Sequence, residues 1–290
     1  MADLALDTPV AVLDPPRPVR RRRRGADRGW VAGVVVLGAI VLAALLLPVL
    51  PLPAPTAPDP LSSMQPPSAE HLLGTDRLGR DVLSRVLAGA RVSLLVGAVS
   101  AVLSVLIGMV VGTVAGFSSR AVDSGTMAIN NVFLSFPSLL LAIAMVAVFG
   151  AGVWQVVLAI VIGDAPQAIR MQRSMVLSLK SRPYMDAARM AAAPTWWLLV
   201  RHVVPNTVAP MVVLSSIYAA SAIVTESALS FLGLGVVPPT PSWGNIMADG
   251  RPYLQEAWWI SAFPGIAIVV VSIALHLLSD GLRQKLRVAR

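Results

Sequence analysis

Two long stretches without a charged residue constrain this chain more than any other feature. No Asp, Glu, Lys or Arg occurs between Arg91 and Arg120, and none occurs between Asp123 and Asp164. A helix needs about 20 apolar residues to cross a bilayer, and its backbone groups must pair within the helix. The first stretch fits one spanning helix. The second fits two, with a turn at residues 150–152.

The composition agrees with a membrane protein. Of 290 residues, 56% are hydrophobic and 13% are charged, whereas soluble domains average about 25% charged residues. Even a large soluble domain leaves about a quarter of its unfolded surface exposed, so a soluble fold could not hide this much apolar surface. We therefore expect lipid to surround much of the chain.

The pattern predicts an all-α polytopic membrane protein with about six transmembrane helices. Gly108 and Gly112 form a G-x-x-x-G motif, which either marks a helix contact or reflects the frequency of glycine in membrane helices. The predicted spans are Trp30–Val49, Val92–Phe117, Asn131–Phe149, Val153–Met171, Thr207–Leu232 and Ala257–Leu278. The predicted segments are a basic tail (1–28), a retained anchor helix (29–50), an extracytoplasmic loop with an amphipathic segment (51–91), a core domain with five spans (92–282) and a second tail (283–290).

The basic residues predict the orientation. Arginines cluster in the N-terminal tail at Arg17, Arg20 to Arg24 and Arg28, and more lie in 170–201 and 283–290. Because cytoplasmic loops carry an excess of Lys and Arg, we expect a multi-pass protein of the cytoplasmic membrane with both termini in the cytoplasm. The net charge of +8 is also compatible with nucleic-acid binding. The arginines of the N-terminal tail lie directly beside an apolar span, however, which favours a membrane anchor over a nucleic-acid partner.

The longest polar interruption is Ser181–Trp197. Pro183 is placed for the first turn of a helix and Asp186 adds favourable negative charge there. The alanine-rich run that follows favours helix, and Pro194 is expected to end it. Two interpretations remain on these grounds alone: an interfacial helix joining two spans, or a docking helix for a cytoplasmic protein.

A resemblance favours the docking helix. The segment YMDAAR at Tyr184–Arg189, followed by RHVVPN at Arg201–Asn206, resembles the "EAA" coupling loop of ABC importer permeases. Four further blocks resemble the C-type subunits of dipeptide and oligopeptide permeases, and they occur in the family's order. These blocks are Leu73–Arg85, Gly89–Leu94, Ser230–Gly244 and Gly281–Arg283.

The resemblance implies a type I ABC importer permease fold and a function. The chain would be the membrane-spanning, non-enzymatic subunit of an ATP-driven peptide importer working by alternating access, and the alternative is import of nickel or another small solute. It would form a heterodimer with a second permease, above one or two cytoplasmic ATPases, and receive peptide from an extracytoplasmic binding protein. No cofactor is expected on this chain, since ATP and Mg would bind the ATPases. In agreement, neither Lys180 nor Lys285 lies in the Gly-x-x-x-x-Gly-Lys-Ser/Thr context of a phosphate-binding loop.

The resemblance also assigns residues to the contact with the ATPase. They are Tyr184, Asp186, Ala187, Ala188, Arg189, Ala192, Ala193, Pro194, His202 and Pro205. The family usually has Glu where this chain has Asp186 and Gly where it has Ala192, so Pro194 is expected to supply the bend. Candidate residues for docking the binding protein are Asp76, Arg80, Asp81, Pro241, Ser242 and Trp243.

Two acidic residues lie within predicted spans and are candidates for the pore or its gate. A charge at the centre of a spanning helix costs at least about 2.5 kcal/mol, so such groups usually face a cavity or a partner. Glu226 would meet a peptide amino group or fix the outer gate. Asp164, where the family often has an aromatic residue, would line the path or pair with Arg170.

Two other functional classes fit less well. An intramembrane protease needs paired aspartates, a Ser–His pair or His-Glu-x-x-His, and Asp164 has no second intramembrane aspartate. The three histidines, His71, His202 and His276, are far apart and predict no metal site. A passive channel or scaffold would not need the docking helix.

Overall fold

The computed structural model describes the backbone of residues 24–288, and this part of the chain is built of helices and connecting loops without a strand. The predicted tail at 1–28 therefore lies outside the described residues, except for the helical backbone of 24–28. The helices are α1 (Arg24–Leu46), α2 (Val82–Phe117), α3 (Arg120–Leu134), α4 (Ser138–Phe149), α5 (Val153–Lys180), α6 (Pro183–Met190), α7 (Thr195–Leu198), α8 (Val204–Phe231), α9 (Trp243–Gly250) and α10 (Trp259–Val288).

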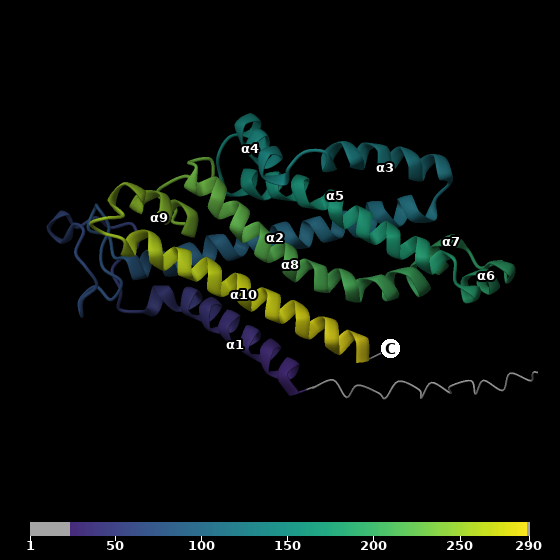
Figure 1. Cartoon of the computed structure of the whole chain (residues 1–290), viewed down its shortest axis with the longest axis horizontal. Coiled ribbons are helices and arrows are strands. Elements are labelled where there is room, and N and C mark those ends of the chain that lie inside the picture. The colour runs from purple at the N-terminus through teal and green to yellow at the C-terminus, as the bar shows by residue number, and fades with distance from the viewer. Residues whose placement is uncertain (1–23, 289–290) are drawn as a thin grey trace, which may run out of the picture.

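The long helices lie side by side, as Figure 1 shows, with α6 at one end of the molecule and α9 beside the 51–81 loop at the other. We call these the α6 end and the α9 end. Among residues 24–288, five helical stretches are long and apolar enough to cross a membrane, namely Gly29–Val49, Val82–Phe117, Val153–Lys180, Thr195–Phe231 and Trp259–Lys285. The count is six if α3 and α4 form one bent span.

The third predicted span is not one straight helix. α3 and α4 meet at an angle of 87°, and Pro137 stands immediately before α4. Proline has no amide hydrogen to continue a helical ladder. The 12 residues of α4 reach only about 18 Å at 1.5 Å per residue, which is too short to cross a bilayer without α3.

The second predicted span begins earlier than expected. α2 starts at Val82 rather than Val92, because the Asp81 carboxylate accepts a hydrogen bond from the amide of Ser84 (2.8 Å) and caps the helix. Arg85 is buried within its first turns, where an ion pair neutralises its charge. The C-terminal part of the predicted amphipathic segment, from Val82 onward, therefore belongs to the same helix as the span.

Glycine allows α2 and α5 to pack closely. A Cβ added to Gly108 would lie 2.5 Å from the Cβ of Ala168, and one added to Gly112 would lie 2.6 Å from the carbonyl oxygen of Ile169. These distances leave no room for any side chain, so of the two interpretations of the G-x-x-x-G motif the structure shows the helix contact. α8 packs against both helices, and α2, α5 and α8 together form the centre of the bundle.

Candidate functional site

At the α6 end, α6 is a short helix exposed to solvent and anchored by one side chain. Met185 is fully buried and packs with Val176 of α5, Leu198 of α7 and Val203. The remainder of α6 is largely exposed, including Tyr184, Asp186, Ala187 and Arg189. The Asp186 and Arg189 side chains form an exposed ion pair at 3.2 Å. Ala188 instead faces the buried cluster, so of the two adjacent alanines only Ala187 is available to a partner.

The chain leaves α6 through a left-handed residue. Ala192 has φ +56°. The Ala192 amide donates to the carbonyl of Arg189 (2.9 Å), and the Ala193 amide donates to that of Ala188 (3.1 Å). This is the Schellman pattern that ends many helices, usually with glycine at the left-handed position. The prediction that Pro194 ends the helix is wrong: α6 ends at Met190, and Pro194 precedes α7 instead.

His202 lies at the point where the chain turns into α8. Its ring contacts Tyr184 (centroids 5.6 Å apart) and Trp197 (5.0 Å), and its Nε2 has no hydrogen-bond partner among the described residues. Residues Leu199–Val203 form a π-helical turn. Pro205 follows it and lacks the amide that would bond the carbonyl of Arg201, which explains why the regular ladder opens here. The predicted coupling residues are thus brought together around one α6–α8 junction.

The α9 end is held by a buried ion cluster. Arg80 contacts Asp76 (2.6 Å) and Asp249 of α9 (3.1 Å). Arg85 of α2 contacts Asp249 (2.9 Å) and also pairs with Asp76. Asp81 accepts from His71 at 3.0 Å as well as capping α2. These contacts tie the 51–81 loop to α2 and α9.

The candidates for docking the binding protein mostly point inward. Asp76 and Trp243 are 0% exposed, Pro241 is also buried, and the Arg80 side chain is 12% exposed. Ser242 and Asn245 form a capping box at the start of α9. These side chains therefore stabilise the α9 end and are not available to a partner in this conformation. The exposed residues nearby include Leu61, Leu72, Arg77 and Leu78.

Glu226 of α8 is fully buried and bonded within the chain. It accepts hydrogen bonds from Ser93 of α2 (3.0 Å) and from Ser230 (2.8 Å). Ser93 in turn accepts the amide of Trp243 (3.2 Å). Glu226 therefore links α8 to α2 and, through Ser93, to α9. Of its two predicted roles, the geometry favours the structural one.

Asp164 of α5 has a different environment. It is partly exposed, and no described residue donates a hydrogen bond to it or forms an ion pair with it. Of the two roles predicted for Asp164, pairing with Arg170 is not observed, because Arg170 reaches Asn131 instead (3.5 Å). Arg173, one turn of α5 further on, pairs with Asp123 of α3 (Nη2–Oδ2 2.6 Å). Tyr218 of α8 lies within electrostatic range of Asp164.

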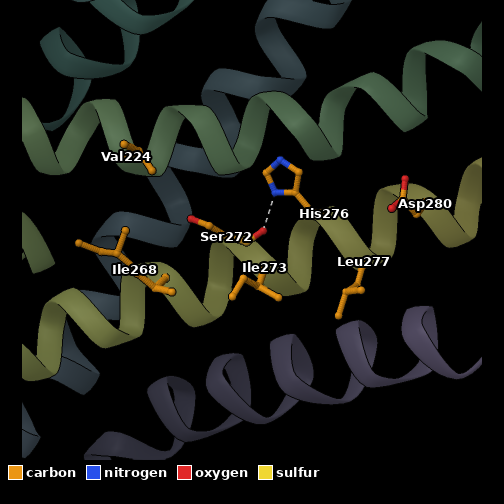
Figure 2. A pocket seen from close by; sticks show the side chains of 8 residues that line it. Val224, Ile268, Ser272, Ile273, His276, Leu277 and Asp280 are labelled. Atoms are coloured by element: carbon orange, nitrogen blue, oxygen red, sulfur yellow. Dashed lines mark hydrogen bonds between the residues drawn. The ribbon is translucent and has the colours of Figure 1, made fainter.

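A groove of about 410 Å³ runs along α10 beside α8. Figure 2 shows His276 projecting from α10 toward α8, while Ile273 and Leu277 project toward α1. His276 Nδ1 donates to the carbonyl oxygen of Ser272 (2.7 Å). The other lining residues are mainly apolar, which suits a membrane-facing or partner-facing groove better than a catalytic one.

Sequence reasoning identified the α6 junction but missed Tyr218, Asp249 and Ser93. Asp249 and Ser93 are ordinary polar residues in their local sequence, and their roles depend on contacts across more than 100 positions. Tyr218 offers a weak signal, as an isolated phenol within an apolar run.

Comparison with known proteins supports one family. Residues 104–288 match the family described as "Binding-protein-dependent transport system inner membrane component". The chain is 44% identical over 229 residues to the di/tripeptide transport system permease protein DppC of Pseudomonas aeruginosa, covering 77% of this chain and 76% of that protein. It is 41% identical over 220 residues to the glutathione transport system permease protein GsiD of Pectobacterium atrosepticum, covering 76% and 73%.

The fold is also found in a solved structure. The MetNI methionine ABC transporter, in an inward-facing conformation, superposes with a TM-score of 0.56 over 72% of this chain and 97% of the matched chain, at 17% identity. The shared fold, the family match over most of the helical core and the identity to permeases across three quarters of the chain agree. This chain therefore belongs to the family of binding-protein-dependent transport system inner membrane components, and is a multi-pass permease of the inner membrane.

Proposed function

We propose that this chain is the translocating subunit of an ATP-driven importer of dipeptides or oligopeptides. Its relatives include permeases named for di/tripeptide and D,D-dipeptide transport, the latter from Escherichia coli at 38% identity over 221 residues. The observation that carries the proposal is α6: a short exposed helix, held by the buried Met185, placed between two long helices that are apolar enough to cross the membrane.

In this proposal α6 docks on a cytoplasmic ATPase subunit, which binds ATP and Mg. The α6 end and both termini then face the cytoplasm. When the ATPases close, they displace α6, and Met185 transmits the displacement because it packs against both α5 and the start of the α7–α8 stretch. Rigid-body movement of these helices opens the translocation path alternately to the cytoplasmic side and to the extracytoplasmic side of the membrane.

Two further partners follow from the same proposal. A second, homologous permease forms the other half of the path, and an extracytoplasmic binding protein delivers peptide to the α9 end. The exposed Leu61, Leu72 and Leu78 of the outer loop are better placed for that contact than the buried Asp76 or Trp243. Leu61 is 94% exposed, and a hydrophobic side chain so exposed suits a protein contact.

Ala187→Glu tests the docking helix. A bulky charge at this exposed position should abolish uptake and the recovery of the ATPase with the tagged permease, while membrane insertion continues. Thr195→Glu, also exposed but outside α6, is the matched control and should leave both intact. Normal uptake and normal ATPase recovery with Ala187→Glu would overturn the assignment. If the purified transporter takes up another solute, such as nickel, and not peptide, the assignment of α6 as the docking helix stands but the proposed substrate is wrong.

A further inference from the structure

One face of α5, a candidate spanning helix, carries four polar side chains and one methionine. Asp164, Gln167, Met171, Ser174 and Ser178 follow one another at spacings of three and four residues, which places them on a single face. Asp164 is partly exposed and the other four are exposed. α5 is also the least apolar of the five candidate spans. We call these five residues the α5 stripe. Lipid acyl chains offer no hydrogen-bond partners to these polar side chains, so we expect the face to line a water-filled path and not to contact lipid.

The α5 stripe ends where the bundle closes. Toward the α9 end, Val156, Val157 and Ile160 of α5 are at most 2% exposed. They belong to an apolar cluster that also contains Val96 of α2 and Ala222 of α8. Asp164 is the first stripe residue after this closure. It therefore stands at the closed end of a polar face that is exposed toward the α6 end.

The two helices that pack against α5 carry buried hydroxyl groups without hydrogen-bond partners. The hydroxyl of Tyr218, which lies in electrostatic range of Asp164, is buried and has no hydrogen-bond partner in residues 24–288. The same holds for the hydroxyls of Ser100 and Ser104 on α2. Buried hydroxyls are normally hydrogen-bonded, so an unpaired group calls for a ligand, water or ion.

The packing of α2 on α5 brings Ser104 to the level of Asp164. Gly108 of α2 contacts Ala168 of α5. Ser104 and Asp164 each lie one helical turn before these residues, and the two helices run in the same direction, because Gly112 next contacts Ile169. α2, α5 and α8 thus present a carboxylate and hydroxyl oxygens at one level of the bundle.

This arrangement has one negative charge and acceptor oxygens, but no cation from the described part of the chain. A peptide has a positively charged α-ammonium group with three N–H donors, the same set as a lysine side chain. An ammonium group would neutralise Asp164 and donate to the nearby hydroxyl oxygens. A carboxylate could accept hydrogen bonds from the hydroxyl groups, but the negative charge of Asp164 would repel it.

We propose that the α5 stripe lines the translocation path and that Asp164, with Tyr218 beside it, binds the α-ammonium group of the transported peptide at the closed end. This inference rests on the proposed peptide import. It makes Asp164 a specificity-determining residue for peptides with a free amino terminus, and it separates Asp164 from Glu226, whose hydrogen bonds are satisfied within the chain.

The first experiment tests whether the stripe is in water. The chain contains no cysteine, so single cysteines can be placed at Gln167 and Ser174 in the assembled transporter, with Leu42→Cys on α1, 57% exposed, as the lipid-facing control. A membrane-impermeant cationic thiol reagent is added to inside-out vesicles, and the labelled site is identified by mass spectrometry. We expect labelling at both stripe positions at least ten times faster than at position 42, and slower labelling at 167 with excess trialanine. Stripe positions that label no faster than 42 would overturn the proposal.

The second experiment tests the charge. Uptake of trialanine and of N-acetyl-trialanine is measured in proteoliposomes for wild type, Asp164→Asn, Asp164→Glu and the control Ser119→Ala, at an exposed position outside α5. We expect Asp164→Asn to raise the KM for trialanine at least tenfold with little change in kcat, to leave any uptake of the acetylated peptide unchanged, and to be largely rescued by Asp164→Glu. Ser119→Ala should resemble wild type.

The failures are distinguishable. If wild type carries no peptide, the proposed function fails. If wild type carries trialanine and Asp164→Asn carries it with unchanged KM, or loses both peptides equally, the ammonium site is wrong although the import stands. If Asp164→Asn instead removes a dependence of uptake on sodium, the site binds a monovalent cation and the proposal is overturned.

Discussion

The amide of Ala193 donates to the carbonyl oxygen of Ala188 across 3.1 Å, and this bond closes α6 around a left-handed alanine. Both residues also pack against the buried cluster that holds Met185. These contacts fix the direction in which the chain leaves α6, even though alanine at position 192 disfavours the left-handed conformation that it adopts there.

Replacing Ala192 by glycine should stabilise the loop. A left-handed conformation costs a non-glycine residue roughly 1–2 kcal/mol, and the greater freedom of glycine in the unfolded chain offsets about 0.5–1 kcal/mol of that gain. We expect Ala192→Gly to slow proteolysis between α6 and α7. Ala191→Gly is the control, because Ala191 has φ −75°, and it should accelerate cleavage. The same direction of change in both variants would contradict the backbone argument.

Met185→Ala should uncouple the ATPase from transport. The side chain is fully buried among Val176, Leu198 and Val203, and removing a buried methionine side chain costs about 2–5 kcal/mol. We expect ATP hydrolysis by the assembled transporter to continue while peptide uptake falls at least tenfold. Met190→Ala, at a position 83% exposed on the same helix, should change neither. Equal coupling in the two variants would show that α6 does not transmit motion through Met185.

Gly108→Ala should separate α2 from α5. The added methyl group would lie 2.5 Å from the Cβ of Ala168, and overpacking of this kind typically costs about 1–3 kcal/mol. We expect a lower Tm for the purified transporter. Gly38→Ala on α1, where nothing lies within 4 Å, is the control, and its Tm should be unchanged or slightly raised. If the Tm of Gly108→Ala equals that of wild type, the packing of α2 on α5 tolerates a methyl group at this position, and the argument from close packing is wrong.

Substitutions of Glu226 should affect stability more than affinity. Glutamine keeps an oxygen that can accept from Ser93 or Ser230, so Glu226→Gln should retain the KM for peptide and most of the Tm. Leucine accepts no hydrogen bond, and an unsatisfied buried polar group costs about 1–3 kcal/mol, so Glu226→Leu should lower the Tm clearly. A raised KM with an unchanged Tm in Glu226→Gln would instead place this carboxylate on the substrate path.

The helices of the membrane domain could be predicted from the sequence because each depends on local apolar length. Boundaries were less predictable where one distant contact decides them. Besides the cap from Asp81, the start of α2 at Val82 depends on the neutralisation of the buried Arg85 by Asp76 and by Asp249, which is 164 positions away. A charged residue at that position otherwise indicates the end of a span. The break between α3 and α4 had a local signal in Pro137, but its angle depends on packing against α5.

The residues of the candidate site also fall into those that local sequence predicts and those that depend on distant contacts. The α6 junction could be located because its residues are contiguous and carry their own helix signals. The outer residues could not be assigned correctly, since Asp76, Arg80 and Trp243 look like surface recognition residues in sequence and become buried only when the 51–81 loop meets α9. Asp164 was visible as an intramembrane charge, but its lack of a partner depends on where Arg170 and Arg173 point.

α1 and α10, the first and last long helices within residues 24–288, pack against each other. A Cβ added to Gly281 of α10 would lie 2.0 Å from the Cβ of Trp30 on α1, and the Lys285 ammonium lies 3.4 Å from the centre of the Trp30 ring. Because synthesis proceeds from the N-terminus, α1 reaches the bilayer when α10 has not yet been made. The nascent α1 can first pack against α2, whose Arg91 donates to the carbonyl oxygen of Ala44 (2.7 Å), and its contact with α10 can form only after the eight α-helices between α1 and α10 have been made.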